Sequence, residues 1–299
     1  MTIDAHPELP EFDYLRPATL MEASQFLAQH SGEARPLLGG TDIFVRMRDG
    51  LWHDKYLVDV KHLDGSDALV FDPQEGLTLG AAVNMNRVIA SAEVQQHYQL
   101  LAEACRSVAS YQLRTRATVV GNICNASPAG DTIGACLALK GVLTVHGLGG
   151  FRQVPLATFF LGPGKTILEA GDIVTAIHFP RPPHGATGTY LKLGRNKLSD
   201  LSIVGVTVYG YPDASAASGY RFCIALASVA PVPLLVPSAA EHLASKPTTP
   251  KTFKQAAHLA QEACSPIDDV RGGARYRKAM VRNLTEKALG ITWERLGQV

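Results

Sequence analysis

The chain has 299 residues, of which 46% are hydrophobic and 18% are charged. This length is about twice that of a typical domain, so we expect two parts that each bury a core of their own. The 28 basic residues nearly balance the 27 acidic ones, and the formal net charge of +1 excludes the strongly basic surface that attracts nucleic acids or anionic membranes.

The sequence indicates neither secretion, nor membrane insertion, nor metal binding. The N-terminal stretch MTIDAHPELPEFDYL carries acids where a secretion signal needs a basic flank and an apolar run, so a cytoplasmic location is expected. The longest uncharged stretch, residues 224–240, contains three prolines and is too short to span a membrane. The five cysteines are widely spaced and the ten histidines form no HExxH motif, so we expect reduced thiols and no metal site.

The first predicted helix leads into a glycine turn. The stretch TLMEASQFLAQHSG begins with Thr19 and places Glu22 three residues later, which is the pattern of a capping box. Residues 36–38 are then expected to form a short buried strand, and the glycine pair 39–40 a tight turn. A second helix is expected to start at position 41 or 42, so the turn would face a helix N-terminus.

Strands and helices are mixed through the rest of the first half. The apolar patterns predict a helix over residues 86–110 with a break near His97. Strands are expected at residues 55–60, 76–83, 142–147 and 172–180.

The stretch TVVGNICNASPAGD, residues 118–131, opens with branched apolar residues and continues with small and polar ones. Its simplest interpretation is a buried strand that runs into a turn at Gly121 and Asn122. A short apolar helix capped by Asp131 is expected to follow.

A segment rich in proline and glycine, residues 180–188, is the predicted domain boundary. Two apolar strands, 202–211 and 221–229, and three helices, at 237–245, 252–264 and 273–289, are expected beyond it. In the last helix a stripe of Tyr276, Met280, Leu284 and Ala288 is expected to be buried, with Arg277 and its basic neighbours on a solvated face or a docking surface. The fold class is therefore α+β in two parts.

Three common nucleotide-binding or catalytic motifs are incomplete or absent. FFLGPGKT ends like a P-loop, but the first glycine of that motif would fall on Phe159. HGLGGFR has two of the three glycines of a dinucleotide fingerprint, and the third would fall on Arg152. No GxSxG motif is present.

Two glycine turns remain, at residues 39–42 and 121–122. Glycine lets a backbone approach a ligand closely, and free amides at a turn bind phosphate oxygens. The two turns could hold one pyrophosphate between them, or they could be unrelated turns.

Longer motifs resemble one family across essentially the whole chain. They are LLGGTD, TVVGNICNASPAGD, FDYLRPATLMEA, LKLGRNKLSDLSIVGV and DDVRGGARYRKAMVRNLTEKAL. Together they resemble the FAD-binding subunits of molybdenum hydroxylases, the group of xanthine dehydrogenase and carbon monoxide dehydrogenase.

The resemblance implies a fold and a set of partners. It implies an FAD-binding domain of the PCMH (vanillyl-alcohol-oxidase-like) type with two α+β subdomains, at residues 1–182, and a smaller domain of antiparallel sheet and helices at 187–295. A large subunit with a molybdenum cofactor and a small subunit with two [2Fe-2S] clusters would complete a dimer of heterotrimers. Electrons would pass from the clusters to FAD in this chain and on to an external acceptor.

The resemblance also implies which residues bind the cofactor: Leu37, Leu38, Gly39, Gly40, Thr41, Asp42, Ile43, Val108, Thr118, Gly121, Asn122, Asp131, Val174 and Lys192. The amides of residues 39–41 would bind phosphate, and the residues around Gly121 would form a second wall. Val174 and Val108 would pack along the flavin, and Lys192 would lie near its ring. Val120 stands where the family has a glycine. The cofactor is therefore expected to approach one backbone amide of this motif less closely.

Two other functions stay open. One is a stand-alone flavin oxidoreductase of the same fold superfamily, which would need its own substrate pocket. The other is a non-catalytic interaction subunit whose glycine turns bind nothing. The substrate of the complex and its electron acceptor cannot be predicted from this chain.

Overall fold

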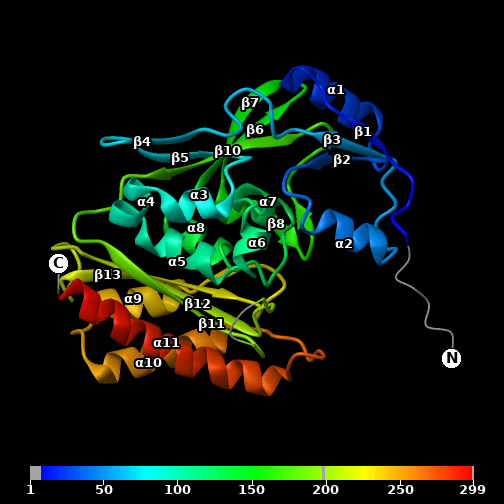
Figure 1. Cartoon of the computed structure of the whole chain (residues 1–299). Helices are drawn as coiled ribbons and strands as arrows, with labels where there is room; N and C mark the ends of the chain where they lie inside the picture. The colour runs from blue at the N-terminus through cyan, green and yellow to red at the C-terminus, as the bar shows by residue number, and fades with distance from the viewer. Residues whose placement is uncertain (1–7, 197–198, 298–299) are drawn as a thin grey trace, which may run out of the picture.

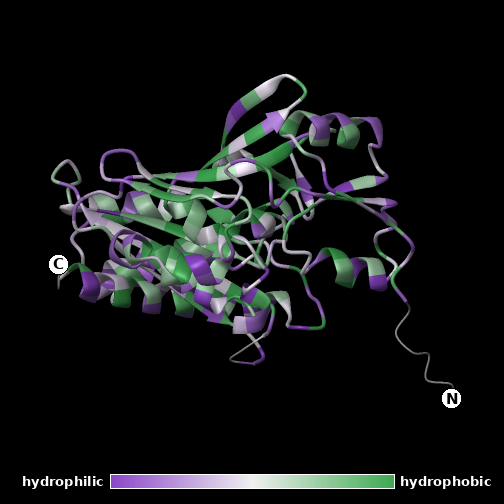
Figure 2. Cartoon of the chain, turned by 45° about the horizontal axis from the view of Figure 1, so that its top comes forward, coloured by the Kyte–Doolittle hydropathy of each residue, from purple (hydrophilic) through white to green (hydrophobic). Residues whose placement is uncertain are grey.

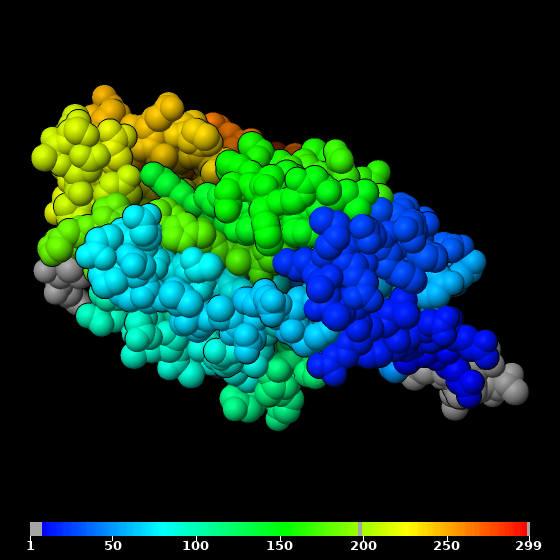
Figure 3. Space-filling view, turned by 90° about the horizontal axis from the view of Figure 1, so that it is seen from above, coloured from blue at the N-terminus to red at the C-terminus, as the bar shows by residue number. Residues whose placement is uncertain are grey.

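The computed structural model describes residues 8–196 and 199–297. Figure 1 shows four layers, in which a sheet, a group of helices, a second sheet and a final group of helices lie on one another. A small unit from the N-terminal part of the chain forms one end of the molecule. Figure 3 shows this unit in blue from above, next to green residues from the middle of the chain.

The N-terminal unit is a parallel three-stranded sheet with two helices. Its strands are β1 (Asp13–Leu15), β3 (Tyr56–Asp59) and β2 (Ala34–Leu37), in that spatial order. Helix α1 (Leu20–Gln29) starts as predicted, because the Thr19 hydroxyl accepts a hydrogen bond from the Glu22 amide at 3.2 Å. Helix α2 (Ile43–Arg48) follows the glycine turn, with Asp42 at its N-cap position.

The second subdomain is built on an antiparallel five-stranded sheet in the order β4-β5-β10-β6-β7. The strands are β4 (Leu69–Asp72), β5 (Gly76–Gly80), β6 (Val142–Gly147), β7 (Gly150–Pro155) and β10 (Ile173–Pro180). A 3-10 turn (Leu156–Thr158) and the small hairpin of β8 (Phe160–Gly162) and β9 (Lys165–Thr166) precede β10. The strands predicted at residues 76–83, 142–147 and 172–180 are confirmed, whereas β4, β7 and the hairpin were not predicted.

Six short helices cover one face of this sheet (Figure 1). They are α3 (Met85–Ala90), α4 (Ala92–His97), α5 (Gln99–Ser107), α6 (Tyr111–Arg114), α7 (Val119–Cys124) and α8 (Ile133–Ala138). The predicted break near His97 is confirmed. A further break falls at Ser91, whose hydroxyl accepts from the Val94 amide and so caps α4.

The strand interpretation of the stretch at 118–131 is wrong, because the stretch forms helix α7. Thr118 caps this helix by accepting a hydrogen bond from the Gly121 amide at 2.9 Å. Val119, Val120 and Ile123 are buried on one side, a spacing that a helix turns towards the core. Asp131 does not cap the next helix either, since α8 begins after Thr132 and has no side-chain cap.

The last part of the chain forms an antiparallel four-stranded sheet and three helices. The strands, in spatial order, are β11 (Thr187–Leu193), β12 (Val204–Pro212), β13 (Tyr220–Ala227) and β14 (Leu234–Leu235). Helices α9 (Pro237–Ser245), α10 (Pro250–Ala263) and α11 (Ala274–Leu296) lie below it in Figure 1, and α5 and α8 lie above it. Figure 2 shows hydrophobic residues, in green, concentrated in the strands and helices at the centre of the molecule. In the part of the chain that the structure describes, no helix combines the length and the apolar character needed to cross a membrane.

The buried stripe of α11 differs from the predicted one. Ala288 is buried as predicted, and Met280 and Leu284 are partly buried. Over the first turns, however, the fully buried residues are Arg277, Val281 and Thr285, one position after the predicted ones, while Tyr276 is 47% exposed. Arg277 was expected on a solvated or docking face but is only 1% exposed. Its guanidinium can be buried because Asp269 and three backbone carbonyls accept its hydrogen bonds.

Asp269 is expected to make the stability of this part of the chain depend on pH. Burial alone would raise the pKa of Asp269, but hydrogen bonds from Arg271 and Arg277 hold it below its ordinary value of 3.8. A carboxyl group with a lowered pKa stabilises the fold above its ordinary value and loses this effect as the pH falls through its folded pKa. We therefore expect Asp269→Asn to lower the free energy of unfolding by about 1 to 3 kcal/mol at neutral pH and to flatten its decline below pH 4. Urea unfolding across this pH range measures both effects, and parallel curves for the two proteins would contradict the assignment.

Candidate functional site

A cavity of about 380 Å³ lies between the N-terminal unit and the second subdomain. Three segments form its walls, the glycine turn before α2, helix α7 and the stretch from Gly164 to β10. The predicted site residues that line it are Leu38, Gly39, Gly40, Thr41, Asp42, Ile43, Val108, Thr118, Gly121, Asn122 and Val174. The structure therefore brings the glycine turn and helix α7 together, although they lie far apart in the sequence, and Gly121 and Asn122 belong to that helix rather than to the predicted turn. Groups of three or more metal-ligating side chains are absent from residues 8–196 and 199–297.

The glycine turn exposes a run of backbone donors beside the cavity. Among the described residues, no hydrogen-bond acceptor pairs with the amides of Gly39, Gly40, Thr41, Asp42 or Ile43. Consecutive free amides in a turn that opens a helix form an anion-binding concavity. This wall of the cavity can therefore bind the oxygens of a phosphate.

The two glycines of this turn are required by packing and by conformation. A Cβ atom at position 39 would lie 2.3 Å from the carbonyl oxygen of Arg116, so only glycine lets the two loops touch there. Gly40 has φ +75°, in the left-handed region, and a Cβ atom there would also meet the ring of Phe44 at 2.7 Å. The glycine pair thus fixes the distance between the first two walls.

The wall formed by α7 presents side chains rather than bare backbone. The amide of Gly121, expected to face a phosphate, instead donates to Thr118, and the amide of Asn122 donates to the Thr118 carbonyl. Val120 is 1% exposed and belongs to the core, so its side chain does not occupy the cavity. The family glycine at position 120 is therefore replaced without narrowing the site.

Two asparagines of this wall offer free polar groups. The side-chain oxygen of Asn122 accepts a hydrogen bond from Thr132 at 2.7 Å, which fixes the amide at the cavity edge. Asn125 donates to the Asp42 carboxylate at 3.0 Å and so connects the two walls. The buried side-chain oxygen of Asn125 has no partner among the described residues, so a ligand that donates a hydrogen bond would satisfy it.

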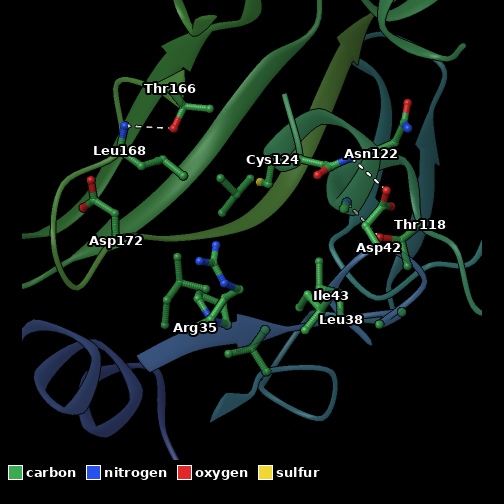
Figure 4. Close-up of a pocket in the computed structure, with 18 of the residues that line it drawn as sticks. Arg35, Leu38, Asp42, Ile43, Thr118, Asn122, Cys124, Thr166, Leu168 and Asp172 are labelled. Carbon is green, nitrogen blue, oxygen red and sulfur yellow. Dashed lines mark hydrogen bonds between the residues drawn. The ribbon is translucent and has the colours of Figure 1, made fainter. Parts of the chain in front are cut away.

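Most of the third wall was not predicted, and Val174 is the predicted residue that lies in it. Gly164 and Thr166, from the stretch rejected as a P-loop, line the cavity together with Leu168 and Asp172 (Figure 4). Burial alone would raise the pKa of Asp172, but hydrogen bonds from Arg152 and from the Glu169 amide hold it below its usual range. Asp172 therefore stays charged and keeps this loop in place.

Arg35 and Trp52 also line the cavity and were not predicted from the sequence. Arg35 lies on β2 and points into the space between the walls in Figure 4. Its guanidinium lies 3.7 Å from the centroid of the Trp52 ring, and its Nε donates to Asp54 at 2.8 Å. Arg46 also stacks on Trp52, at 4.7 Å. An arginine held in this way can pair with a phosphate or stack on a base.

Three predicted site residues do not line the cavity among the described residues. Leu37 is 4% exposed and packs in a small core with Met47 and Leu57. Asp131 and Lys192 instead form an ion pair between the two parts of the chain, with 2.7 Å between Nζ and the carboxylate.

The Asp131 and Lys192 pair belongs to a buried network. Tyr190 donates to the same carboxylate at 2.7 Å, and Lys192 also donates to the Ser107 carbonyl at 3.1 Å. Tyr190 and Lys192 share a face of β11 because they are two residues apart. Burial raises the pKa of Asp131 even though Lys192 and Tyr190 favour its charged form.

Comparison with known proteins shows that this fold is that of a flavin-binding subunit. Residues 10–182 match the family described as the FAD binding domain in molybdopterin dehydrogenase, and residues 189–292 match the CO dehydrogenase flavoprotein C-terminal domain. The chain belongs to the FAD-binding subunits of the molybdenum hydroxylase family.

Individual relatives extend over nearly the full length. The chain is 32% identical to the carbon monoxide dehydrogenase medium chain of Hydrogenophaga pseudoflava, over 96% of this chain and 98% of the relative. It is 28% identical to the xanthine dehydrogenase FAD-binding subunit of Escherichia coli O157:H7, over 92% and 94%. A solved structure of the Hydrogenophaga pseudoflava carbon monoxide dehydrogenase superposes with a TM-score of 0.91 at 30% identity, covering 96% of this chain and 99% of that chain. The fold class, the family and the FAD cofactor predicted from the sequence are therefore confirmed.

Proposed function

We propose that this chain holds FAD in the cavity between its N-terminal unit and second subdomain and transfers electrons within a molybdenum hydroxylase complex. The run of free amides at Gly39–Ile43 carries this proposal, because it offers five donors where a pyrophosphate would need them. The unpaired oxygen of Asn125 and the guanidinium of Arg35 add an acceptor and a positive charge at the same cavity.

Each wall would contribute in its own way. The glycine turn would bind the phosphates, while Asn122 and Asn125 would bind polar groups along the cofactor. Val108 and Val174 would pack on its apolar surface, since both line the cavity. Bound FAD supplies the chemistry, because it can accept and release electrons one or two at a time.

Lys192 would influence the flavin from the junction between the two parts of the chain. Its ammonium lies 2.7 Å from the Asp131 carboxylate and its side chain is 14% exposed, so the ammonium is held in one position. A fixed positive charge near a flavin would favour the reduced, more negative form. We assign no other residue of this chain to the chemistry.

The partners follow from the family. A small subunit with two [2Fe-2S] clusters would deliver electrons, and a large subunit with the molybdenum cofactor would oxidise the substrate. We propose a dimer of such heterotrimers in the cytoplasm, with the FAD-binding domain at residues 1–182 and the smaller domain at 187–295. The alternative of a stand-alone flavin oxidoreductase requires turnover by this chain alone.

Purification from its native host separates the two functions. A tag on this chain is expected to bring down a molybdenum-containing subunit and an iron-sulfur subunit in equal amounts, and substrate-dependent reduction of the flavin should require both. Flavin reduction by a small organic substrate in the isolated chain would overturn the proposal in favour of the stand-alone enzyme.

Arg35 provides a test of the cavity assignment. We expect Arg35→Ala to weaken FAD binding by about tenfold, because the site loses a positive charge and a stacking surface worth about 1 to 2 kcal/mol. Arg35→Lys should retain part of the affinity, since it keeps the charge. Fluorescence titration with FAD measures the loss. The matched control is Arg48→Ala, in the last turn of α2, where the arginine is exposed. Equal affinities of Arg35→Ala and the control would contradict the assignment.

A further inference from the structure

We propose that Arg277, in the C-terminal part of the chain, is a positioning residue for the flavin site. The inference rests on the proposed function, because it assumes that FAD occupies the cavity described above. Arg277 does not line that cavity. It would act through a chain of hydrogen bonds that leads from α11 to the loops around the cavity.

Arg277 is a fully buried cation with a complete set of acceptors. It is 1% exposed, and its Nη2 donates to Asp269 at 2.5 Å. Its Nη1 donates to the carbonyls of Ile203 and Ser228, at 3.2 and 2.9 Å, and its Nε donates to the carbonyl of Gly272. One planar guanidinium thus fixes the backbones of three loops, which a more flexible ammonium could not do.

Two of these loops form hydrogen bonds to a turn in the proposed FAD-binding domain. Ser202, next to Ile203, donates to the Ala129 carbonyl at 3.3 Å and shares a hydrogen bond of 2.6 Å with Ser228. The amide of Ser228 donates to the Pro128 carbonyl at 2.7 Å. Ser228 has φ +65°, in the left-handed region, so its backbone requires support to keep this geometry. The Arg277 bond to the Ser228 carbonyl provides that support.

The turn that receives these bonds connects directly to the cavity. The Ala126 carbonyl, at the start of this turn, accepts from the amide of Gly164, which lines the third wall. Asn125, one residue earlier, lines the second wall. Asp131, at the end of the turn, holds Lys192. A displacement of the turn at residues 126–131 would therefore move two walls and the lysine together.

The test uses the FAD-loaded protein and two substitutions. Arg277→Met removes all of the hydrogen bonds, and Arg277→Lys retains the charge beside Asp269 but cannot reach both carbonyls. We expect both variants to fold and to bind FAD about tenfold more weakly. We also expect a changed visible circular dichroism spectrum of the bound flavin and a shifted reduction potential, with the smaller change in Arg277→Lys. A role confined to core stability would leave the spectrum and the potential unchanged.

Arg275→Met is the matched control, because Arg275 is an exposed arginine on the same helix. Folded Arg277 variants with wild-type FAD affinity, spectrum and potential would overturn the inference. So would failure of both variants to fold, because Arg277 would then be a residue of the C-terminal core alone. If the wild-type protein binds no FAD, the proposed function itself fails, and this outcome is separate from the other two.

Discussion

Gly39→Val is expected to purify without FAD and to bind added FAD about 100-fold more weakly than the wild type. The Cβ atom would lie 2.3 Å from the Arg116 carbonyl oxygen, which belongs to backbone and cannot rotate away. The two loops must separate, so the free amides of the turn move away from the walls that face them. A 100-fold loss corresponds to about 3 kcal/mol of binding free energy, which is modest for the displacement of several phosphate donors.

Gly149→Val is the matched control for this experiment. Gly149 lies in the turn between β6 and β7, and a Cβ atom there would meet no other atom within 4 Å. The control should retain FAD and the unfolding midpoint of the wild type. FAD retention by a folded Gly39→Val chain would show that the contact between the loops does not shape the site.

Lys192→Met is expected to have the largest effect on stability. The substitution leaves the Asp131 carboxylate buried with Tyr190 as its remaining side-chain partner, and an unpaired buried charge costs about 3 kcal/mol. Urea unfolding of the protein without cofactor measures this loss separately from any effect on FAD. Lys254→Met, which replaces an exposed lysine on α10, should change the unfolding free energy by less than about 0.5 kcal/mol.

The pH dependence of this variant has a definite sign. Burial already raises the pKa of Asp131, and loss of Lys192 should raise it further. A carboxyl group with a raised pKa loses folding stability as the pH increases through the window between its unfolded and folded pKa values. The destabilisation by Lys192→Met should therefore be smaller at acidic than at neutral pH, and Asp131→Asn in the same chain should recover part of it. An equal loss at every pH would contradict the ion-pair account.

Most of the fold could be predicted from the sequence because local signals agreed with the tertiary structure. Thr19 and Glu22 mark the start of α1, and alternating apolar residues mark β5. Helix α7 could not be predicted in this way, since six residues rich in branched side chains favour a strand locally. The Thr118 cap and burial of one face outweigh that preference.

The buried arginine of α11 shows a different limit. A periodic stripe that began with Tyr276, Met280 and Leu284 was apolar enough to suggest the core face, yet the fully buried residues there are Arg277, Val281 and Thr285, one position later. Arg277 donates hydrogen bonds to the carbonyls of Ser228 and Ile203, which lie 49 and 74 residues earlier in the chain, and no local pattern contains that information.

Most of the residues predicted from the two glycine motifs, together with Val108 and Val174, line the cavity, whereas Arg35 and most of the third wall were not predicted. The glycine turn and helix α7 lie side by side because residue 39 contacts the backbone at residue 116, two residues before the Thr118 cap of that helix. The stretch around Thr166 and Asp172 and the Arg35 side chain carry no distinctive pattern, and only the packing of three segments places them at the cavity. Asp131 and Lys192 were identified together through the family, but their hydrogen bonds to each other at the domain junction required the structure.

The FAD content of the purified chain tests the central claim most directly. The protein should show the visible absorbance of a bound flavin, release about one FAD per chain on denaturation and take up FAD again when refolded. Gly39→Val should lose this capacity while Gly149→Val keeps it. A folded, colourless wild-type protein that takes up no added FAD would contradict the account.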